Sequence, residues 1–424
     1  MRKRPTTRNL GLNATGLLVV SFLVFTASDL FGQDGGSKST SNKDADSRIL
    51  TTDFREQLAD EGWEAASEST RVEQIEVADD PAEYGVRIRN GAVLGPKCKV
   101  LPHHYYRLRF RAKTPQRAHW AATFVTKDGR EIVADVYDAI DASPDWQSYT
   151  FMFRAHPDAR HVRIRVQPDY MQIDAAPLSV RNLRLDEVSA TEVAQWADEG
   201  VSVCPLVHFE AAPDRWQHLP RTMLRLCQGG KLRIVMLGDS ICNDTSNSLY
   251  ETQLARLYPE ARIEVVTSVR GGTGCWYYKD DDRVREYVLD YEPDLLVIAG
   301  ISHHFDPESI RSVIRQVRQK SDCEILVMSG AVTPEGTMQR AHLKSKPIST
   351  AMWEMEQFTR RMRRMCREEE AEFFDIRRAW DDYMLRSQLP YDFVSRDPIH
   401  ANGRGKQILA RLLTRYFEPK EDGP

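Results

Sequence analysis

The chain has 424 residues, of which 41% are hydrophobic and 28% are charged. At about 100–200 residues per domain, this length predicts two folded units with additional segments. A mean hydropathy of −0.50 is typical of a globular protein and excludes a collagen-like, wholly disordered or polytopic membrane chain. The 58 basic and 62 acidic residues give a net charge of −4, so no basic surplus favours nucleic acid or anionic lipid as a partner.

The first residues have the pattern of a targeting segment. Four basic residues within the first eight precede an apolar stretch, Leu17–Phe25, that is too short for a comfortable membrane span. We therefore predict a signal peptide over residues 1–32 and a secreted or periplasmic protein, with an uncleaved N-terminal anchor as the alternative. Residues 33–48 are rich in Gly, Ser, Asp and Lys, which predicts a flexible linker.

The segment from residue 49 to 190 consists of short runs in which apolar and polar residues alternate. This period of two predicts strands with one buried face, and the absence of helical spacing between the runs predicts an all-β sandwich. The runs are Tyr84–Arg89, Tyr106–Arg111, Ala118–Val125, Trp146–Phe153, His161–Val166 and Leu178–Leu185.

The last three runs are also similar to the final strands of jelly-roll carbohydrate-binding modules. The similarity lies in the Trp-led run Trp146–Phe153, the Arg/Val run Val162–Val166 and the closing Asn182–Asp186. It implies a jelly roll over residues 49–190 that binds sugar. Aromatic side chains suited to stacking on sugar rings are Trp120, Tyr137, Trp146 and Tyr170. The alternative is that these rings fill the core of the sandwich.

The segment from residue 216 to 420 alternates between strand and helix patterns, which predicts an α/β domain with a parallel sheet covered on both faces. Residues 191–215 read as a linker, so we expect the sandwich to fold alone and the α/β domain to work without it. The predicted strands are 232–237, 262–266, 294–299, 323–328 and 373–376, and the predicted helices are 248–257, 307–319, 350–372 and 403–416.

Two motifs of the α/β domain together indicate nucleophilic catalysis. Gly238-Asp239-Ser240 follows the first strand directly, and active sites of such sheets lie beyond the carboxyl ends of the strands. Asp397 precedes His400 by three residues, so one short turn can set the carboxylate against Nδ1 and leave Nε2 free for a serine. Taken alone, Ser240 can equally be an ordinary helix cap.

Two further segments follow the second and third strands. The glycine-rich stretch Arg270–Gly274 permits close approach of the backbone, but its spacing does not match a nucleotide-binding loop. Gly300 to His304 follows the third strand. Its two histidines, with Asp306, have the residue types of a metal site, but no second ligand cluster supports that alternative.

Together these segments resemble the SGNH hydrolases, also called GDSL esterases. The resemblance implies a three-layer α/β/α fold and ester hydrolysis by Ser240, His400 and Asp397 without a metal or other cofactor. It also implies an oxyanion hole formed by the Ser240 and Gly274 N–H groups and a third donor. The family has Asn at the third position, whereas this chain has Ser302. A serine hydroxyl is shorter than an amide and carries one proton. Three alternatives therefore stay open: Ser302 donates, His303 or His304 takes its place, or the oxyanion hole consists of the two backbone N–H groups alone.

The sequence therefore predicts a serine esterase that removes acyl groups, in particular O-acetyl groups, from a carbohydrate. Its substrate would be an acylated small molecule or polysaccharide, with His303 and His304 contacting it. Three alternatives stay open: a carbohydrate O-acyltransferase, a lipase or lysophospholipase, and a non-catalytic glycan-binding protein. No membrane contact beyond the signal segment and no nucleic acid are expected.

The positions of two cysteines predict a disulfide. Seven cysteines are too few for a disulfide-built scaffold, but an exported chain permits single bridges. Cys242 lies two residues after Ser240, and Cys275 lies one residue after Gly274. Because neighbouring strands are about 4.8 Å apart, the Cα separation of about 4.4–6.8 Å that a bridge needs is feasible. The alternative is a pair of small buried side chains.

Overall fold

The computed structural model describes residues 47–56, 58–77, 80–172, 174–331 and 348–419. The predicted signal peptide and residues 33–46 of the predicted linker lie outside these residues. Within the described part of the chain, no helix is long and apolar enough to cross a membrane.

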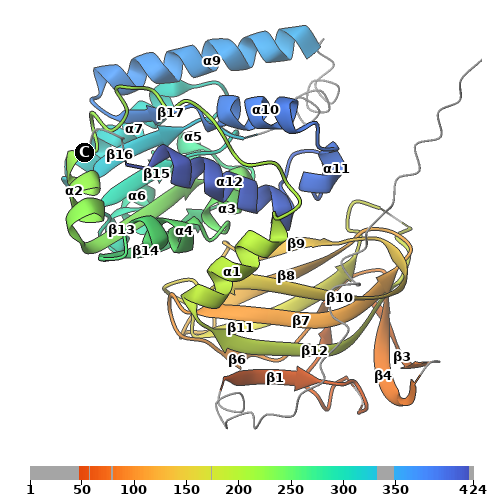
Figure 1. Cartoon of the computed structure of the whole chain (residues 1–424). Coiled ribbons are helices and arrows are strands. Elements are labelled where there is room, and N and C mark those ends of the chain that lie inside the picture. The colour runs from red at the N-terminus through yellow and green to blue at the C-terminus, as the bar shows by residue number, and fades with distance from the viewer. Residues whose placement is uncertain (1–46, 57, 78–79, 173, 332–347, 420–424) are drawn as a thin grey trace, which may run out of the picture. The chain divides into compact units, whose positions relative to one another are not determined.

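Two antiparallel sheets make up the first region (Figure 1). In one sheet the strand order is β10-β7-β12-β4-β3, with β1 paired to β12, and in the other it is β2-β5-β11-β8-β9, with β6 paired to β11. All six predicted strands are present. The strands of the first sheet are β1 (Arg48–Thr52), β3 (Arg71–Val77), β4 (Asp80–Arg89), β7 (Tyr105–Thr114), β10 (Ser143–Arg154) and β12 (Leu178–Val188). Those of the second are β2 (Glu64–Ala65), β5 (Val93–Leu94), β6 (Cys98–Lys99), β8 (Ala118–Val125), β9 (Val136–Ile140) and β11 (His161–Pro168).

The predicted alternation accounts for the core of this sandwich. In β7 the side chains of Tyr106, Leu108 and Phe110 are buried, whereas the intervening arginines are only half-buried. Burying each such apolar side chain stabilises the fold by about 1.5–3 kcal/mol. Trp120 of β8 is 2% exposed and belongs to this core.

A parallel five-stranded sheet with the order β14-β13-β15-β16-β17 forms the second region. Its strands are β13 (Gly230–Gly238), β14 (Ala261–Val269), β15 (Leu295–Ile298), β16 (Glu324–Met328) and β17 (Glu372–Phe374). The chain places β14 on one side of β13 and β15 on the other, with Leu237 opposite both Ser268 and Ile298. The strand order therefore reverses at β13, and ligands bind at such switch points, beyond the carboxyl ends of the strands.

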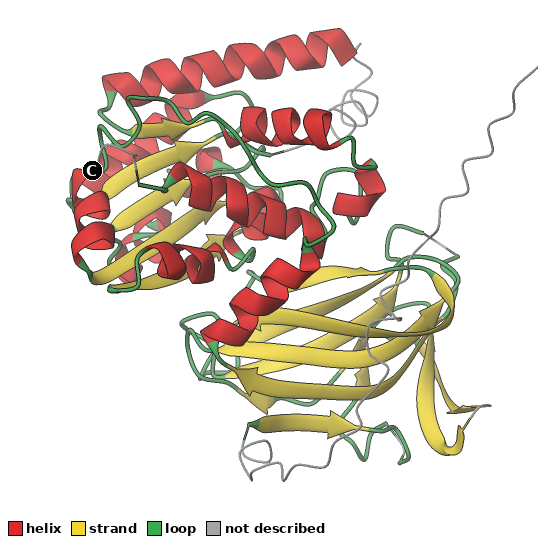
Figure 2. Cartoon of the chain, in the orientation of Figure 1, coloured by secondary structure: helices red, strands yellow, loops and turns green. Residues whose placement is uncertain are grey.

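Helices cover both faces of the parallel sheet (Figure 2). Ile234 and Met236 of β13 pack with α4 and α12, whereas Val235 and Leu237 pack with α5, α7 and α9. On the first face lie α2 (Pro220–Gln228), α4 (Tyr250–Leu257), α10 (Ile376–Ser387) and α12 (Gly403–Tyr416). On the second lie α5 (Cys275–Tyr278), α6 (Arg283–Tyr287), α7 (Pro307–Arg318) and α9 (Ile348–Glu368). The architecture is therefore mixed α/β, with a parallel sheet and two antiparallel sheets.

Several helices were not predicted from the sequence. Helix α3 (Ser240–Ser246) begins immediately after β13, and α10 follows β17 after one residue. Helix α1 (Ala190–Gly200) lies in the predicted linker, where Ser189 and Glu192 form a capping box and Val193 is buried. The sequence signals that could have predicted α1 are its capping box and the helical spacing of its apolar residues.

Buried polar contacts join the sandwich to the α/β region. Arg154 of β10 pairs with Glu251 of α4, and both side chains are almost fully buried, at 4% and 2% exposed. The Nε2 of His156 lies 3.2 Å from the carbonyl oxygen of Thr267. Residues 45–424, which include both regions, form one compact unit.

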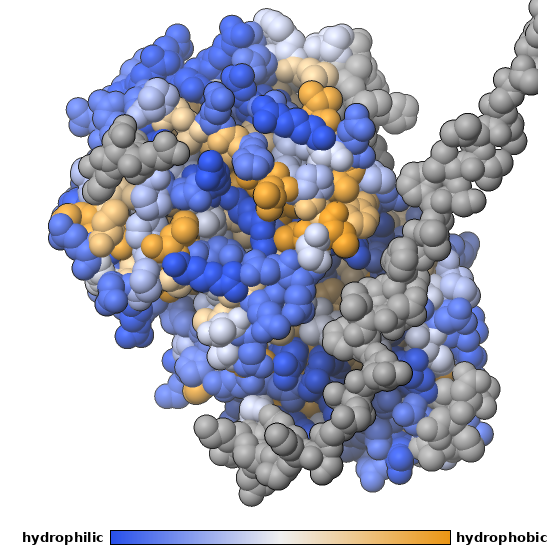
Figure 3. Space-filling model, in the orientation of Figure 1, coloured by the Kyte–Doolittle hydropathy of each residue, from blue (hydrophilic) through white to orange (hydrophobic). Residues whose placement is uncertain are grey.

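The surface is mostly hydrophilic on the face drawn in Figure 3, where apolar residues form separate patches. The most exposed large apolar side chains of the described residues are Leu206, Leu385 and Val203. Isolated apolar residues of this kind are normal on a protein surface and do not by themselves mark a binding site.

Candidate active site

The structure brings Ser240, His400 and Asp397 into one chain of hydrogen bonds. Ser240 is the first residue of α3, and its Oγ lies 2.8 Å from Nε2 of His400. The Nδ1 of His400 lies 2.7 Å from Oδ2 of Asp397. With the proton on Nδ1, the ring donates to the carboxylate, and Nε2 accepts from the serine hydroxyl. This geometry suits a nucleophile and its general base.

A tight turn fixes the Asp397 carboxylate in that position. Its Oδ1 accepts the backbone N–H groups of Ile399 at 2.9 Å and His400 at 3.0 Å. Burial opposes ionisation of Asp397, but the hydrogen bond and charge of His400, together with the Ile399 N–H and the Arg396 charge, outweigh it. They lower the pKa of Asp397 to about 2, so this group is a carboxylate across the neutral range.

Arg396, which directly precedes Asp397, anchors the turn through a buried ion pair. Its side chain is fully buried, and Nη1 donates to Oδ1 of Asp244 in α3 at 2.8 Å. The other oxygen of Asp244 accepts the Ala401 N–H at 3.0 Å. Asp244 therefore ties both ends of the turn to the helix that begins at Ser240. The sequence does not reveal this pair, because an arginine directly before Asp397 carries no signal of its distant partner.

Asp239 joins the serine loop to the loop after β15. Its Oδ1 caps α3 by accepting the Ile241 and Cys242 N–H groups, and Oδ2 accepts the Ile301 and Ser302 N–H groups, both at 2.7 Å. Gly300 allows this approach: its φ is +111°, and a Cβ there would lie 2.4 Å from Oδ1 of Asp239. Asp239 therefore fixes the distance between two loops that carry candidate oxyanion donors.

Two backbone N–H groups at the site have no protein acceptor. Those of Ser240 and Gly274 donate to none of the described residues, which leaves both available to an anion. Gly274 packs directly on the loop after β15, since a Cβ there would lie 2.3 Å from the Ser302 carbonyl oxygen. The Ser302 N–H is bound to Asp239, and its half-buried hydroxyl bonds to none of the described residues.

The two predicted substrate-binding histidines have different environments. His303 is 2% exposed, and its Nδ1 lies 3.3 Å from the Cys275 N–H. Burial lowers the pKa of His303, which suits a neutral ring that accepts the Cys275 N–H and so supports the Gly274–Cys275 backbone. His304 is exposed and stacks on Trp276, with the ring centroids 4.9 Å apart.

The predicted disulfide is absent. All seven cysteines lie within the described residues and are free thiols. Cys242 packs in the core on one face of the parallel sheet, and Cys275 packs in the core on the other face. Burial raises the pKa of both thiols well above the ordinary value. The prediction of a Cys242–Cys275 bridge is wrong because it considered only the spacing between strands, not the directions of the two side chains.

The sandwich contributes directly to the surroundings of His400. The Tyr137 ring of β9 lies 6.4 Å from the His400 ring, and the Arg396 guanidinium lies 4.1 Å above the Tyr137 centroid. Arg117 donates to the Arg396 carbonyl oxygen, and Asn243 of α3 donates to the Asp135 carbonyl oxygen at 2.8 Å. The site therefore contains residues from both regions.

Of the four aromatic residues considered for sugar binding, two lie near this site and two have other environments. Trp120 is in the sandwich core, and the Arg181 guanidinium lies 4.6 Å from the Trp146 ring. Tyr170 is 49% exposed, and its ring lies 4.6 Å from that of His119. Tyr137 and Tyr170 are therefore the two members of this set that lie near His400 and Asp397.

Within the described ranges, no cluster of three or more His, Cys, Asp or Glu side chains could hold a metal ion. The alternative site at His303, His304 and Asp306 thus does not form in this part of the chain.

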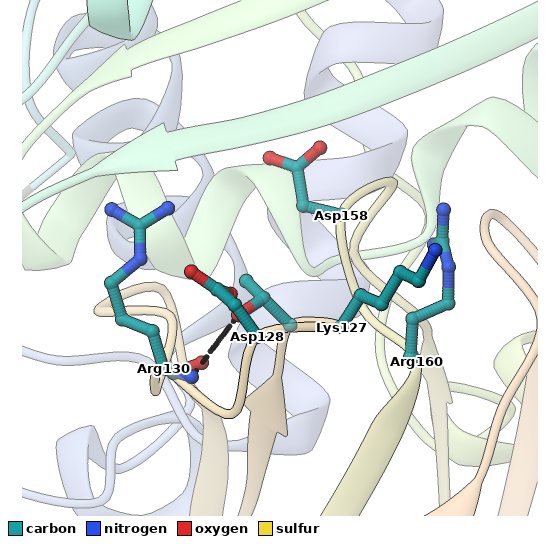
Figure 4. Close-up of a pocket in the computed structure, with 6 residues that line it drawn as sticks. Lys127, Asp128, Arg130, Asp158 and Arg160 are labelled. Carbon is teal, nitrogen blue, oxygen red and sulfur yellow. Dashed lines mark hydrogen bonds between the residues drawn. The ribbon is translucent and has the colours of Figure 1, made fainter.

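A separate pocket lies at the loops after β8 and before β11 (Figure 4). It has a volume of about 480 Å³ and contains no serine, cysteine or histidine. Its lining residues are Thr126, Lys127, Asp128, Arg130, Asp158 and Arg160. Thr126 donates a hydrogen bond to Asp128, but no histidine lies among the lining residues, so the pocket lacks the serine–histidine–carboxylate series found at Ser240.

No protein-family model matches the sequence, and no curated protein matches it. A catalytic mutant of Axe2, an acetylxylan esterase from Geobacillus stearothermophilus, aligns over 45% of this chain and 96% of its own, with 18% identity and a TM-score of 0.37. The two-domain esterase CEX, active on acetylated mannans and co-crystallised with mannopentaose, aligns over 50% of this chain and 56% of its own, with 16% identity and a TM-score of 0.36.

The CBM22-1 xylan-binding domain from Paenibacillus barcinonensis Xyn10C aligns over 34% of this chain and 95% of its own. Its identity is 10% and its TM-score is 0.27. The alignment with CEX spans just over half of that protein. Similarities at these scores do not assign a function to this chain.

Proposed function

We propose that this chain is a serine esterase of the SGNH type that hydrolyses acyl esters of carbohydrates, O-acetyl esters above all. The observation that carries the proposal is the hydrogen-bonded series of Ser240, His400 and Asp397, with distances of 2.8 and 2.7 Å. The position of Ser240 at the switch point of a parallel sheet supports the same function.

The first half of the reaction forms an acyl-enzyme. His400 accepts the hydroxyl proton at Nε2 as Ser240 Oγ attacks the ester carbonyl carbon. Asp397 holds the ring in the required tautomer and stabilises the imidazolium that forms. Its lowered pKa keeps it ionised in this role. Collapse of the tetrahedral intermediate breaks the bond to the alcohol oxygen, which takes the proton from His400.

Water completes the cycle. With the alcohol gone, His400 accepts a proton from a water molecule, whose oxygen attacks the acyl carbon. The second tetrahedral intermediate releases the carboxylic acid and returns the proton to Ser240 Oγ. Transfer to a sugar hydroxyl in place of water would be the acyltransferase alternative.

The unoccupied N–H groups of Ser240 and Gly274 are the proposed oxyanion donors, with the Ser302 hydroxyl as the third. Loss of one oxyanion donor typically costs about 2.7–4 kcal/mol of transition-state stabilisation. The change from Asn to Ser is therefore expected to reduce the rate without removing the activity. The Asp239 contacts preorganise both loops, which lowers the cost of reorganisation during the reaction.

Carbohydrate is the proposed substrate because a sandwich with an exposed tyrosine lies beside the triad. Export through the N-terminal segment is part of the same proposal, since polysaccharide substrates lie outside the cell.

A panel of esters tests the proposed function. Wild type, Ser240→Ala and the control Ser148→Ala, an exposed position on β10, are assayed with ethyl acetate, long-chain esters and acetylated xylo-oligosaccharides. Release of acetate by wild type and Ser148→Ala, but not by folded Ser240→Ala, is the expected result. Preference for long-chain esters would favour a lipase, acyl transfer to added sugars would favour an acyltransferase, and binding without turnover would favour a glycan-binding protein.

A further inference from the structure

Strand β9 presents Tyr137 to the proposed catalytic histidine. Val136 and Ile140 of the same strand belong to the sandwich core, and successive side chains of a strand point to opposite faces. Tyr137, next to Val136, is only half-buried. Its ring lies 6.4 Å from that of His400. Strand β9 is the edge strand of its sheet, so Tyr137 lies at the margin of the sandwich.

A second tyrosine of the sandwich lies next to the first. Tyr170 follows β11 and is 49% exposed. Burial, together with the nearby phenol of Tyr137 and the carboxylate of Asp397, raises the pKa of Tyr170, so the phenol of Tyr170 is a neutral hydrogen-bonding group in the neutral range. His119, which packs on the Tyr170 ring, supports it from the sandwich side.

The reaction mechanism determines which part of a bound substrate these tyrosine rings can contact. His400 must lie within about 2.6–3.2 Å of the alcohol oxygen that it protonates. A group attached to that oxygen therefore lies beside His400, and Tyr137 is the aromatic side chain of the sandwich that packs there. The acyl carbonyl oxygen, in contrast, is bound by N–H groups of the loops after β13 and β14.

An aromatic ring with a polar tip is well suited to a sugar. The ring face covers the apolar C–H surface of a pyranose, and the phenol hydroxyl bonds to its hydroxyl groups. In Tyr137 the Arg396 guanidinium lies 4.1 Å from the ring centroid, and the side chain is only half-buried, so part of its surface is accessible to a ligand.

We propose that Tyr137 and Tyr170 bind the alcohol part of the substrate, and that this part is a sugar ring. The sandwich then determines leaving-group specificity inside the active site, instead of holding polysaccharide at a distance from it. This inference rests on the proposed esterase function and adds to it the residues that select the alcohol.

The test compares two acetyl esters that differ only in the alcohol. Values of kcat/KM are measured for tetra-acetyl xylopyranose and for ethyl acetate, with wild type, Tyr137→Leu, Tyr170→Ala and the control Tyr84→Ala. Tyr84 is a half-buried tyrosine of the other sheet of the sandwich. An aryl acetate is avoided, because its aromatic leaving group would itself pack on Tyr137.

Tyr170→Ala and Tyr137→Leu are each expected to lower the ratio of kcat/KM for the sugar ester to kcat/KM for ethyl acetate about tenfold. Tyr84→Ala should match wild type on both esters. An equal loss on both esters would show a purely structural role and overturn the inference, as would an unchanged value for the sugar ester in Tyr170→Ala. Failure of wild type to hydrolyse either ester would instead overturn the proposed function, and the inference with it.

Discussion

Arg117, which directly precedes strand β8 of the sandwich, donates from Nη1 to the backbone carbonyl oxygen of Arg396 at 2.7 Å. Arg396 is the residue before Asp397, so this bond connects the sandwich to the turn that carries the proposed acid–base pair. The sandwich therefore positions the turn as well as contributing aromatic side chains to its surroundings.

Loss of that bond should affect the chemical step more than substrate binding. Arg117→Ala is expected to lower kcat for ethyl acetate about 10- to 100-fold, because small displacements of a catalytic group are costly. KM should change less. Arg117→Lys should recover part of the rate, and Lys113→Ala, an exposed control on β7, should behave as wild type. A loss confined to KM would contradict the positioning role.

Arg396 should matter for stability. Arg396→Met leaves Asp244 buried without its partner, and breaking a buried ion pair on one side costs about 3–5 kcal/mol. Urea unfolding of Arg396→Met, Asp244→Asn and the double variant measures this cost. Because the two side chains pair directly, at 2.8 Å, the double variant should lose less free energy of unfolding than the sum of the single variants. Strict additivity would argue against the pairing.

The α/β region should not fold without the sandwich. Glu251 is 2% exposed and pairs with Arg154, so removal of the sandwich leaves an unpaired carboxylate and newly exposed polar groups. A fragment that begins at residue 216 is expected to lack a cooperative thermal transition by circular dichroism, whereas the chain from residue 47 onward shows one. A folded fragment that hydrolyses ethyl acetate at the full-length rate would refute this expectation.

Asp135 should make stability depend on pH. Burial raises its pKa to about 6, against the opposing charge of Arg165 and the hydrogen bond from Thr123. The folded state thus keeps a proton that the unfolded state has lost, and the contribution of Asp135 to stability falls as pH rises from about 4 to about 6.

Asp135→Asn removes that dependence while keeping an acceptor for Thr123. Relative to wild type it should be more stable by about 2 kcal/mol at pH 7.5 and close to equal at pH 4. Urea unfolding at both pH values provides the measurement. The same difference in unfolding free energy at pH 4 and pH 7.5 would exclude the proposed titration.

Asp397→Asn should cost far more in rate than in fold. The amide cannot hold the required imidazole tautomer, and the equivalent change in a well-studied serine protease triad lowers kcat about 10⁴-fold. Because the pKa of Asp397 is about 2, its contribution to stability is complete above about pH 4 and is lost only as pH falls through that range. If the rate of the wild type falls as the pH decreases near neutrality, that fall therefore cannot be assigned to protonation of Asp397.

The sequence predicted the strands and the proximity of Ser240, His400 and Asp397 because their signals are local. Alternation gave the sandwich strands, apolar runs gave the parallel strands, and Ser240 and His400 followed from short motifs beside them. The hydrogen-bonded series links Ser240 to Asp397, which lie 157 residues apart in the sequence. It forms only because the strand order brings the two segments to the same edge of the parallel sheet.

Other features depend on side-chain directions and distant contacts that a sequence pattern does not contain. The capping of two loops by Asp239, the pairing of Arg396 with Asp244 and the position of Tyr137 beside His400 all belong to this class. The wrong Cys242–Cys275 prediction has the same cause, since the two side chains pack on opposite faces of the sheet.

Covalent labelling tests the assignment of Ser240 as the nucleophile most directly. The full chain is treated with a fluorophosphonate, from which the attacking serine oxygen displaces fluoride, and the adduct is located by peptide mass spectrometry. We expect one adduct, on Ser240, which is absent in Ser240→Ala and forms much more slowly in His400→Ala. An adduct on another residue, or ester hydrolysis by a protein that remains unlabelled at Ser240, would contradict the account.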